Sequence, residues 1–141
     1  MSDGEIRLLE RFPGVADYMR LRALTGLSPK SEQAARRGLA NTTYGVSLLR
    51  GEDVVGMGRI VGDDGCFYFV VDIAVDPALQ GQGQGKRIMA ALDAWLRANA
   101  PTTAHVSLFA DGDARYLYEK YGFAVSEKSV GMMYRIASDA G

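Results

Sequence analysis

The chain is poor in the residues that build disulfides and metal sites. Among its 141 residues there is one cysteine, Cys66, and one histidine, His105. A single cysteine excludes an internal disulfide and a cysteine-based metal cluster, and it is consistent with a reducing compartment. We therefore expect no metal in this protein.

The chain also lacks an excess of charge of either sign and any long apolar run. Its 16 Lys and Arg are balanced by 17 Asp and Glu. A dedicated nucleic-acid-binding protein is normally clearly basic, so we do not expect nucleic acid as a partner. No segment approaches the roughly 18 apolar residues that span a membrane, and the first residues carry no apolar signal core. We interpret the chain as soluble and cytoplasmic, with no membrane partner.

The length and the apolar pattern predict one domain, residues 1–141, of mixed α/β (α+β) class. Strands are expected at 5–10, 43–50, 54–62, 66–75, 104–110, 123–127 and 131–136. Helices are expected at 14–24, 31–40 with Ser31 as N-cap, 84–100, and 111–121 capped by Asp111 or Asp113 and ended by Gly122. Tight turns make the strands between 43 and 75 antiparallel neighbours, and the crossover through 84–100 adds a parallel strand. The expected sheet is mixed and mostly antiparallel.

Three glycines at alternate positions, Gly81, Gly83 and Gly85, precede the clearest helix in the stretch "LQGQGQGKRIM". Glycine costs about 1 kcal/mol relative to alanine inside a helix, so it is used where the backbone needs positive φ or close approach to another group. Backbone amides that lead into a helix N-terminus form an anion site. The stretch therefore predicts a phosphate-binding loop, the alternative being a glycine-rich turn with no ligand.

Two common phosphate motifs do not fit this loop. A P-loop would need glycine where Gln80 stands and Ser or Thr where Arg87 stands. A GxGxxG dinucleotide motif would need its third glycine at Lys86 or at Ile88, depending on the starting glycine. The loop is therefore of another type.

The remaining pattern, Gln80-x-x-Gly83-x-Gly85 after "VVDIAVDP", resembles the coenzyme A loop of the GCN5-related N-acetyltransferases (GNAT). A second segment, "DARYLYEKYGF" (113–123), is similar to the downstream tyrosine-containing segment of that family. The resemblance covers nearly the whole chain. It implies helices on both faces of the sheet and a splayed central strand pair. It also implies acetyl transfer from acetyl-CoA to a primary amine of a small-molecule or peptide acceptor, by direct attack in a ternary complex.

The resemblance also implies which residues form the site. Contacts to the cofactor are expected from Ile73, Ala74, Val75, Gln80, Gly81, Gln82, Gly83, Gln84, Gly85, Lys86, Arg87, Asp111, Ala114 and Tyr118. The family tyrosine, here Tyr118, would protonate the leaving thiolate, and an N–H near Ile73 would donate to the oxyanion. The family often has Asn where this chain has Asp111, which cannot donate when ionised.

Several roles stay open at this point. Asp72 is a charged residue within an apolar run. It is either a functional group, which takes the amine proton through water or attracts a cationic substrate, or a hydrogen-bond partner that holds a strand bulge. Tyr118 has the alternative of core packing with its hydroxyl bonded to backbone. His105, the one histidine, is expected to be structural rather than catalytic. Cys66 is expected to be inert, which disfavours a covalent cysteine route.

The acceptor is expected to enter beside the first two helices and their loop, residues 24–31. Asp63 and Asp64 are acidic groups that could face an amine. Arg59 could bind a carboxylate or phosphate, the alternative being a strand charge that faces solvent. The sequence does not identify the acceptor and leaves room for a homodimer. The rival functions are a non-catalytic acyl-CoA-binding or regulatory module on the same fold, and a general nucleotide-binding protein.

Overall fold

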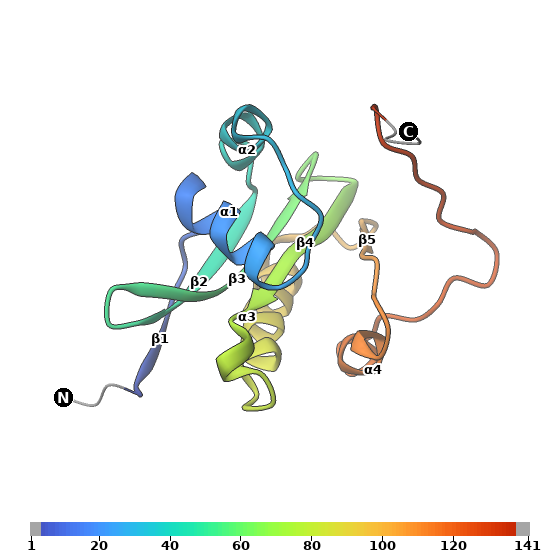
Figure 1. Cartoon of the computed structure of the whole chain (residues 1–141). Helices are drawn as coiled ribbons and strands as arrows, with labels where there is room; N and C mark the ends of the chain where they lie inside the picture. Colours follow the sequence, from blue (N-terminus) through green and yellow to red (C-terminus); the bar gives the residue numbers. More distant parts are fainter. Residues whose placement is uncertain (1–3, 138–141) are drawn as a thin grey trace.

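A computed structural model describes residues 4–137 and contains a five-stranded sheet whose strands follow one another in chain order (Figure 1). The strands are β1 (Ile6–Leu9), β2 (Tyr44–Arg50), β3 (Asp53–Gly62), β4 (Phe67–Val75) and β5 (His105–Ser107). The helices are α1 (Val15–Leu24), α2 (Glu32–Leu39), α3 (Gln84–Asn99) and α4 (Ala114–Glu119), with a 3-10 turn at Pro77–Leu79. Strands β1 to β4 are antiparallel and β5 is parallel to β4, which confirms the mixed, mostly antiparallel sheet.

Helices cover both faces of the sheet, and each face has its own apolar core. One core joins α3 to the sheet through its four buried residues, Ile88, Met89, Leu92 and Leu96. Trp95 is partly buried against the same core. The other core joins α1 and α2 to the opposite face through Tyr18, Leu21, Ala35, Val54, Met57 and Ala74. The sheet is therefore the middle layer between α3 and the α1–α2 pair.

Local signals explain some of the element ends. The Ser31 side chain accepts a hydrogen bond from the Ala34 amide at 3.0 Å, so it caps α2 as expected. Gly122 adopts φ 96°, a left-handed conformation that suits glycine just after α4. The predicted side-chain cap of α4 is not found, because Asp113 occupies the N-cap position without a side-chain hydrogen bond.

Glycine at position 58 lets α3 approach the sheet closely. A Cβ atom on Gly58 would lie 2.5 Å from Cγ2 of the buried Ile88. Any larger residue would therefore push α3 away from β3 or distort the core between them.

The last two predicted strands, 123–127 and 131–136, are wrong, and β5 is shorter than the expected 104–110. Residues 124–137 form an irregular tail, and its apolar side chains are exposed. A strand needs a hydrogen-bonded neighbour as well as a suitable composition. The tail runs outward from α4, past β5, and has no such neighbour among residues 4–137 (Figure 1).

None of the helices within residues 4–137 is long and apolar enough to cross a membrane.

Candidate active site

The glycine loop leads directly into α3 with left-handed backbone at two of its three glycines. Gly81 has φ 82°, and Gly83, the N-cap of α3, has φ 81°. A Cβ atom built on either residue would have no heavy atom within 4 Å, so both face open space. Gly85 is already part of the helix. The loop therefore exposes bare backbone in a conformation that other residues adopt only with strain.

The amides at the start of α3 are free to bind a ligand. The first amide with a backbone partner is that of Arg87, which donates to the Gly83 carbonyl at 3.0 Å. Within the described part of the chain, the amides of residues 83–86 have no hydrogen-bond partner. The positive end of the dipole of the 16-residue helix lies at these amides. Four free donors at a helix N-terminus fit the diphosphate of coenzyme A.

The side chains of the loop divide into engaged and free groups. The Gln80 amide nitrogen donates to the Val75 carbonyl at 3.2 Å, which ties the loop to the end of β4. Arg87 donates to the Ile6 carbonyl at 2.7 Å, so its guanidinium is directed to β1. Lys86 is exposed, and the side-chain oxygen of Gln84 is buried without a partner among the described residues. The groups near the start of α3 that are free to meet an anion are thus backbone amides, with the exposed Lys86 as the adjacent cation.

Next to the loop, β4 separates from β5. The parallel pairing of the two strands ends at Phe69 and Ser107, although β4 continues to Val75. Beyond that point β4 carries a bulge, where the register with β3 shifts and Asp72 has φ 60°. The second half of β4 therefore has one edge without a strand partner, as the expected splayed pair requires.

The alternation of the backbone tells which groups of β4 face this open edge. The Asp76 amide donates to a β3 carbonyl at 2.8 Å, and its neighbour Val75 directs its carbonyl the other way, to Gln80. Because successive residues of a strand bond to opposite sides, Ile73 faces the same side as Val75. Of the three residues expected to contact the cofactor, Ile73 and Val75 face the opening and Ala74 faces β3.

The carboxylate of Asp72 is buried in a cluster of cations on the α1–α2 side of the sheet. Its side chain is 6% exposed and accepts from Arg22 at 2.5 Å and from Arg59 at 2.7 Å. The Tyr18 hydroxyl donates to both carboxylate oxygens at 3.2 Å. Burial, and then the Asp72 charge, raise the pKa of Tyr18, so its hydroxyl keeps its proton. Both oxygens of Asp72 are therefore occupied by donors from α1 and β3.

The same two arginines fasten the helical layer to the sheet. Arg22 also donates to the carbonyl and hydroxyl of Ser28 in the α1–α2 loop. Arg59 donates to the Gly38 carbonyl and to the Thr42 hydroxyl, at the end of α2. Through Asp72, the bulge of β4 is thus joined to the segment where the acceptor is expected.

Sequence reasoning did not single out Tyr18 or Arg22 for this cluster. The two residues lie four positions apart in α1, and both are buried together with Leu21. The signal available in the sequence was this arginine, four positions after a tyrosine on an inward-facing side of the helix. A guanidinium buried there needs a carboxylate partner, which would have pointed to the cluster.

The short helix α4 brings Tyr118 beside the start of α3. The Tyr121 hydroxyl donates to the Lys86 carbonyl at 3.2 Å, and a Leu117 methyl lies 3.9 Å from the position of a Cβ on Gly85. Tyr118 is partly buried against the α3-side core, and its hydroxyl has no hydrogen-bond partner within residues 4–137. Burial, and then the charge of Asp111, raise its pKa. The phenol is therefore protonated at neutral pH and available as a donor.

The remaining candidates lie elsewhere or serve the backbone. His105 is exposed on β5 and stacks on Phe67, with ring centroids 5.9 Å apart, and Cys66 is a free exposed thiol. The Asp63 carboxylate accepts from the amides of residues 65–67, and these bonds, led by that of Phe67, lower its pKa. Asp64 accepts from the Tyr68 hydroxyl at 2.9 Å. Asp63 and Asp64 therefore build the β3–β4 turn.

Comparison with known proteins agrees with this geometry. Residues 42–125 match the family model for the acetyltransferase (GNAT) domain. An uncharacterized N-acetyltransferase of Pyropia yezoensis is 31% identical over 100 residues, which cover 68% of this chain and 56% of that protein. The chain thus spans about half the length of the curated relatives it matches.

Solved structures give the same result over most of the chain. A protein of unknown function from meticillin-resistant Staphylococcus aureus, named a probable acetyltransferase, is 37% identical with a TM-score of 0.87. The match covers 93% of this chain and 98% of that one. A GNAT family acetyltransferase of Streptococcus pneumoniae is 26% identical with a TM-score of 0.72, over 93% and 96% of the two chains. With the family model covering more than half of its residues, the chain belongs to the GNAT family of acetyltransferases.

Proposed function

We propose that this protein is a single-domain N-acetyltransferase that moves the acetyl group of acetyl-CoA to a primary amine of a small molecule or peptide. The observation that carries the proposal is the row of free amides at residues 83–86, at the positive end of α3 and beside the unpaired edge of β4. This arrangement combines a diphosphate site with a slot in which an extended arm finds strand-like partners. We infer direct attack in a ternary complex, because the free thiol Cys66 lies on the β3–β4 turn and not at the loop.

The chain's own residues would hold the cofactor in two places. The amides of residues 83–86 and the exposed Lys86 would bind the diphosphate. The groups of Ile73 and Val75 that face the β4 opening would hydrogen-bond the pantetheine arm. When bound, acetyl-CoA supplies the activated thioester carbonyl and the sulfur leaving group.

Two donors would then act on the reacting atoms. The Ile73 amide would hydrogen-bond the carbonyl oxygen as negative charge develops there, an effect worth about 3 kcal/mol in comparable sites. The Tyr118 hydroxyl, protonated and without a protein partner, would give its proton to the departing sulfur. The lack of a structural hydrogen bond at this hydroxyl supports the catalytic interpretation of Tyr118 over a packing role.

For Asp72 the geometry favours the structural alternative. Both carboxylate oxygens are held by Arg22, Arg59 and Tyr18, so Asp72 can contact an amine only if one of these bonds opens. We infer that Asp72 is a positioning residue. It holds the β4 bulge, and thereby the Ile73 amide, in place, while the amine proton leaves to solvent.

Cofactor binding is tested with Gly83→Val and a matched control. Gly83 and Gly51 both have positive φ and open space at the Cβ position, but Gly51 lies in the β2–β3 turn, away from α3. A β-branched residue at either place adds strain of about 1–3 kcal/mol. Only at position 83 would it also cover the amides. In isothermal titration calorimetry we expect coenzyme A affinity to fall at least about tenfold in Gly83→Val and to stay unchanged in Gly51→Val.

Two results would change the proposal. Equal coenzyme A affinity in the two variants would remove the loop from the binding site. If ATP or NAD raised the melting temperature of the wild type as much as coenzyme A does in a thermal-shift assay, the result would favour a general nucleotide-binding protein. An acetylation screen over a panel of amines that reads free thiol then separates an enzyme from a non-catalytic acyl-CoA-binding module.

A further inference from the structure

A group of apolar side chains on β4 is part of neither core. Tyr68 and Val70 lie in the core on the α3 side of the sheet. Because successive residues of a strand point to opposite faces, Phe67, Phe69 and Val71 point to the α1–α2 side. Neither core, among residues 4–137, includes any of these three. In Figure 1, α1 and α2 lie over β2 and β3, and the first half of β4 lies beside them without a helix over it.

Phenylalanine rings make up most of this uncovered face. Phe67 and Phe109, which follows β5, are 61% and 58% exposed. The rings of Phe69 and Phe109 meet edge to face, with centroids 5.6 Å apart, and Phe67 stacks on the ring of His105. Exposed apolar side chains that gather in one patch, unlike scattered ones, mark a binding site. We call Phe67, Phe69, Val71 and Phe109 the phenylalanine surface.

The phenylalanine surface leads along β4 to the proposed point of acetyl transfer. At about 3.3 Å per residue, Val71 and Phe69 lie about 7 and 13 Å before Ile73, whose amide is the proposed oxyanion donor. Arg59 stands opposite Val71 in the register of β3 and β4, and it binds the Asp72 carboxylate. Residues paired in this way share a face of the sheet. The surface therefore lies on the side from which the acceptor is expected.

The charge beside the β4 bulge disfavours an acceptor that carries a second cation. Arg22 and Arg59 bring two positive charges against the one negative charge of Asp72, and the three side chains are between 6% and 11% exposed. The cluster therefore keeps one positive charge, which repels a further ammonium group. Apolar surroundings also lower the pKa of an amine, because they disfavour its charged form. They thus help to supply the neutral amine that attacks the thioester.

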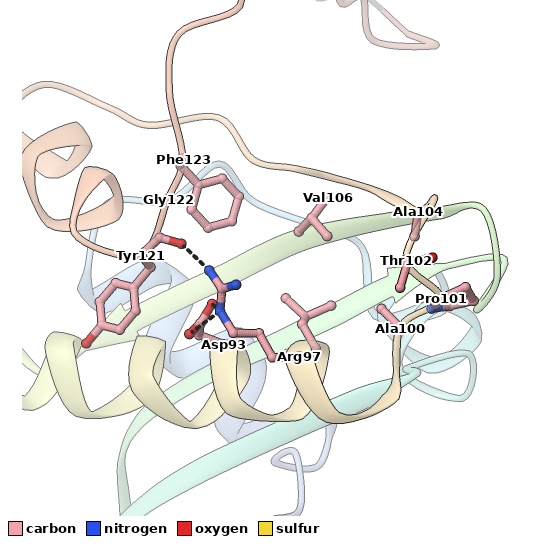
Figure 2. Close-up of a pocket in the computed structure, with 11 residues that line it drawn as sticks. Asp93, Arg97, Ala100, Pro101, Thr102, Ala104, Val106, Tyr121, Gly122 and Phe123 are labelled. Atoms are coloured by element: carbon pink, nitrogen blue, oxygen red, sulfur yellow. Dashed lines mark hydrogen bonds and ion pairs between the residues drawn. The ribbon is translucent and has the colours of Figure 1, made fainter.

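A hollow of about 400 Å³ beside the C-terminal half of α3 is a less suitable place for the acceptor (Figure 2). Leu96 and Val106, which line it, belong to the core on the α3 side. Figure 2 shows Arg97 bonded to Asp93 and to the Tyr121 carbonyl, so the cation there is already paired. At about 1.5 Å per residue, Asp93 lies about 13 Å along α3 from the start of that helix. The hollow is thus on the face of the sheet opposite to the arginine cluster and the α1–α2 loop.

We propose that the phenylalanine surface holds the apolar part of the acceptor, and that the acceptor is a monoamine whose amino group is carried by an aromatic or similarly bulky apolar group. The inference rests on the proposed acetyl transfer and specifies its substrate class. The ring of the acceptor packs against Phe69 and Phe109 in the edge-to-face or offset geometry that aromatic pairs prefer. Its amine then extends past Val71 to the acetyl group at the β4 opening.

The test compares kcat/KM for three amines at saturating acetyl-CoA, read as free thiol. Phenethylamine carries a ring, ethylamine lacks it, and spermidine carries additional ammonium groups. Phe69→Ala and Phe109→Ala each remove one ring from the surface. The matched control is Tyr116→Ala, because Tyr116 is an aromatic residue of α4 that is 52% exposed and contacts Arg115. Each variant is scored by the ratio of two amines on one preparation, so the folded fraction cancels.

We expect the wild type to favour phenethylamine over ethylamine and over spermidine at least about tenfold in kcat/KM, as burial of a ring in an apolar site provides. Phe69→Ala and Phe109→Ala should lose most of the preference over ethylamine with an unchanged KM for acetyl-CoA, whereas Tyr116→Ala should keep it.

A preference for ethylamine or spermidine, or a ring preference that either phenylalanine variant retains, would overturn the inference and leave acetyl transfer in place. A different result would remove the proposed function itself. If no amine of a wider panel released thiol from protein that binds coenzyme A, the chain would not be an acetyltransferase of amines, and the inference would fall with it.

Discussion

Replacing Asp72 with asparagine removes the carboxylate that is shared by the buried Arg22 and the largely buried Arg59. The side chains of Asp72, Arg22 and Arg59 are 6%, 8% and 11% exposed. Removing one partner of a buried pair typically costs about 3–5 kcal/mol, because the remaining charge stays buried. Asparagine can still accept one of the hydrogen bonds, so we expect the lower end, about 3 kcal/mol. For a chain of this size that corresponds to a melting temperature lower by about 10 °C.

The assay is thermal unfolding followed by circular dichroism, with Asp17→Asn as the matched control. Asp17 pairs with Arg20 on the surface, with both side chains 45% exposed. Such a pair is worth at most about 1 kcal/mol, so the control should melt within about 3 °C of the wild type. Equal melting temperatures for Asp72→Asn and Asp17→Asn would refute the view that the cluster stabilises the fold.

The same variant distinguishes a positioning residue from a general base. If Asp72 only holds the β4 bulge, Asp72→Asn should lower kcat while the pH dependence of kcat/KM keeps its shape. If Asp72 takes the amine proton, the acidic limb of that profile should disappear. Loss of the limb together with an unchanged melting temperature would overturn our interpretation.

Three further perturbations have defined outcomes. Tyr118→Phe should lower kcat about 100-fold or more with little change in KM for acetyl-CoA, and a variant with full activity and a lower melting temperature would exclude proton donation. Burial and a neighbouring glutamate raise the pKa of Tyr44 to about 12, so the fold favours its protonated form. The resulting contribution of Tyr44 to the free energy of unfolding is complete below the unfolded pKa of about 10 and is lost as the pH rises through about 12. Over this pH range the urea midpoint of the wild type should therefore fall more than that of Tyr44→Phe. Gly58→Ala should cost about 1–3 kcal/mol because its Cβ would meet Ile88. Gly65→Ala should be neutral in urea unfolding, because its Cβ would make only ordinary contacts, at 3.9 and 4.0 Å, with two oxygens of Asp63. Equal stabilities of the two variants would contradict the close approach of α3.

The sequence by itself determined the order of β1 to β5, the long helix α3 and the loop before it. Each of these depends on neighbours along the chain: apolar spacing in α3, alternation in the strands, and glycine at Gly81 and Gly83 where φ is positive. The cap at Ser31 is equally local. The free amides at the start of α3 follow from the same local rule, because the first turn of any helix has no internal acceptors.

The tertiary structure decided the surroundings of Asp72 and the path of the tail. Its partners Tyr18, Arg22 and Arg59 are 54, 50 and 13 residues away in sequence, and only the packing of α1 on the sheet brings their donors to one carboxylate. The β-rich composition of residues 123–136 predicted strands, yet a strand forms only where another chain segment supplies its hydrogen bonds. Such partners lie far away in sequence or on another molecule, so local patterns cannot reveal them.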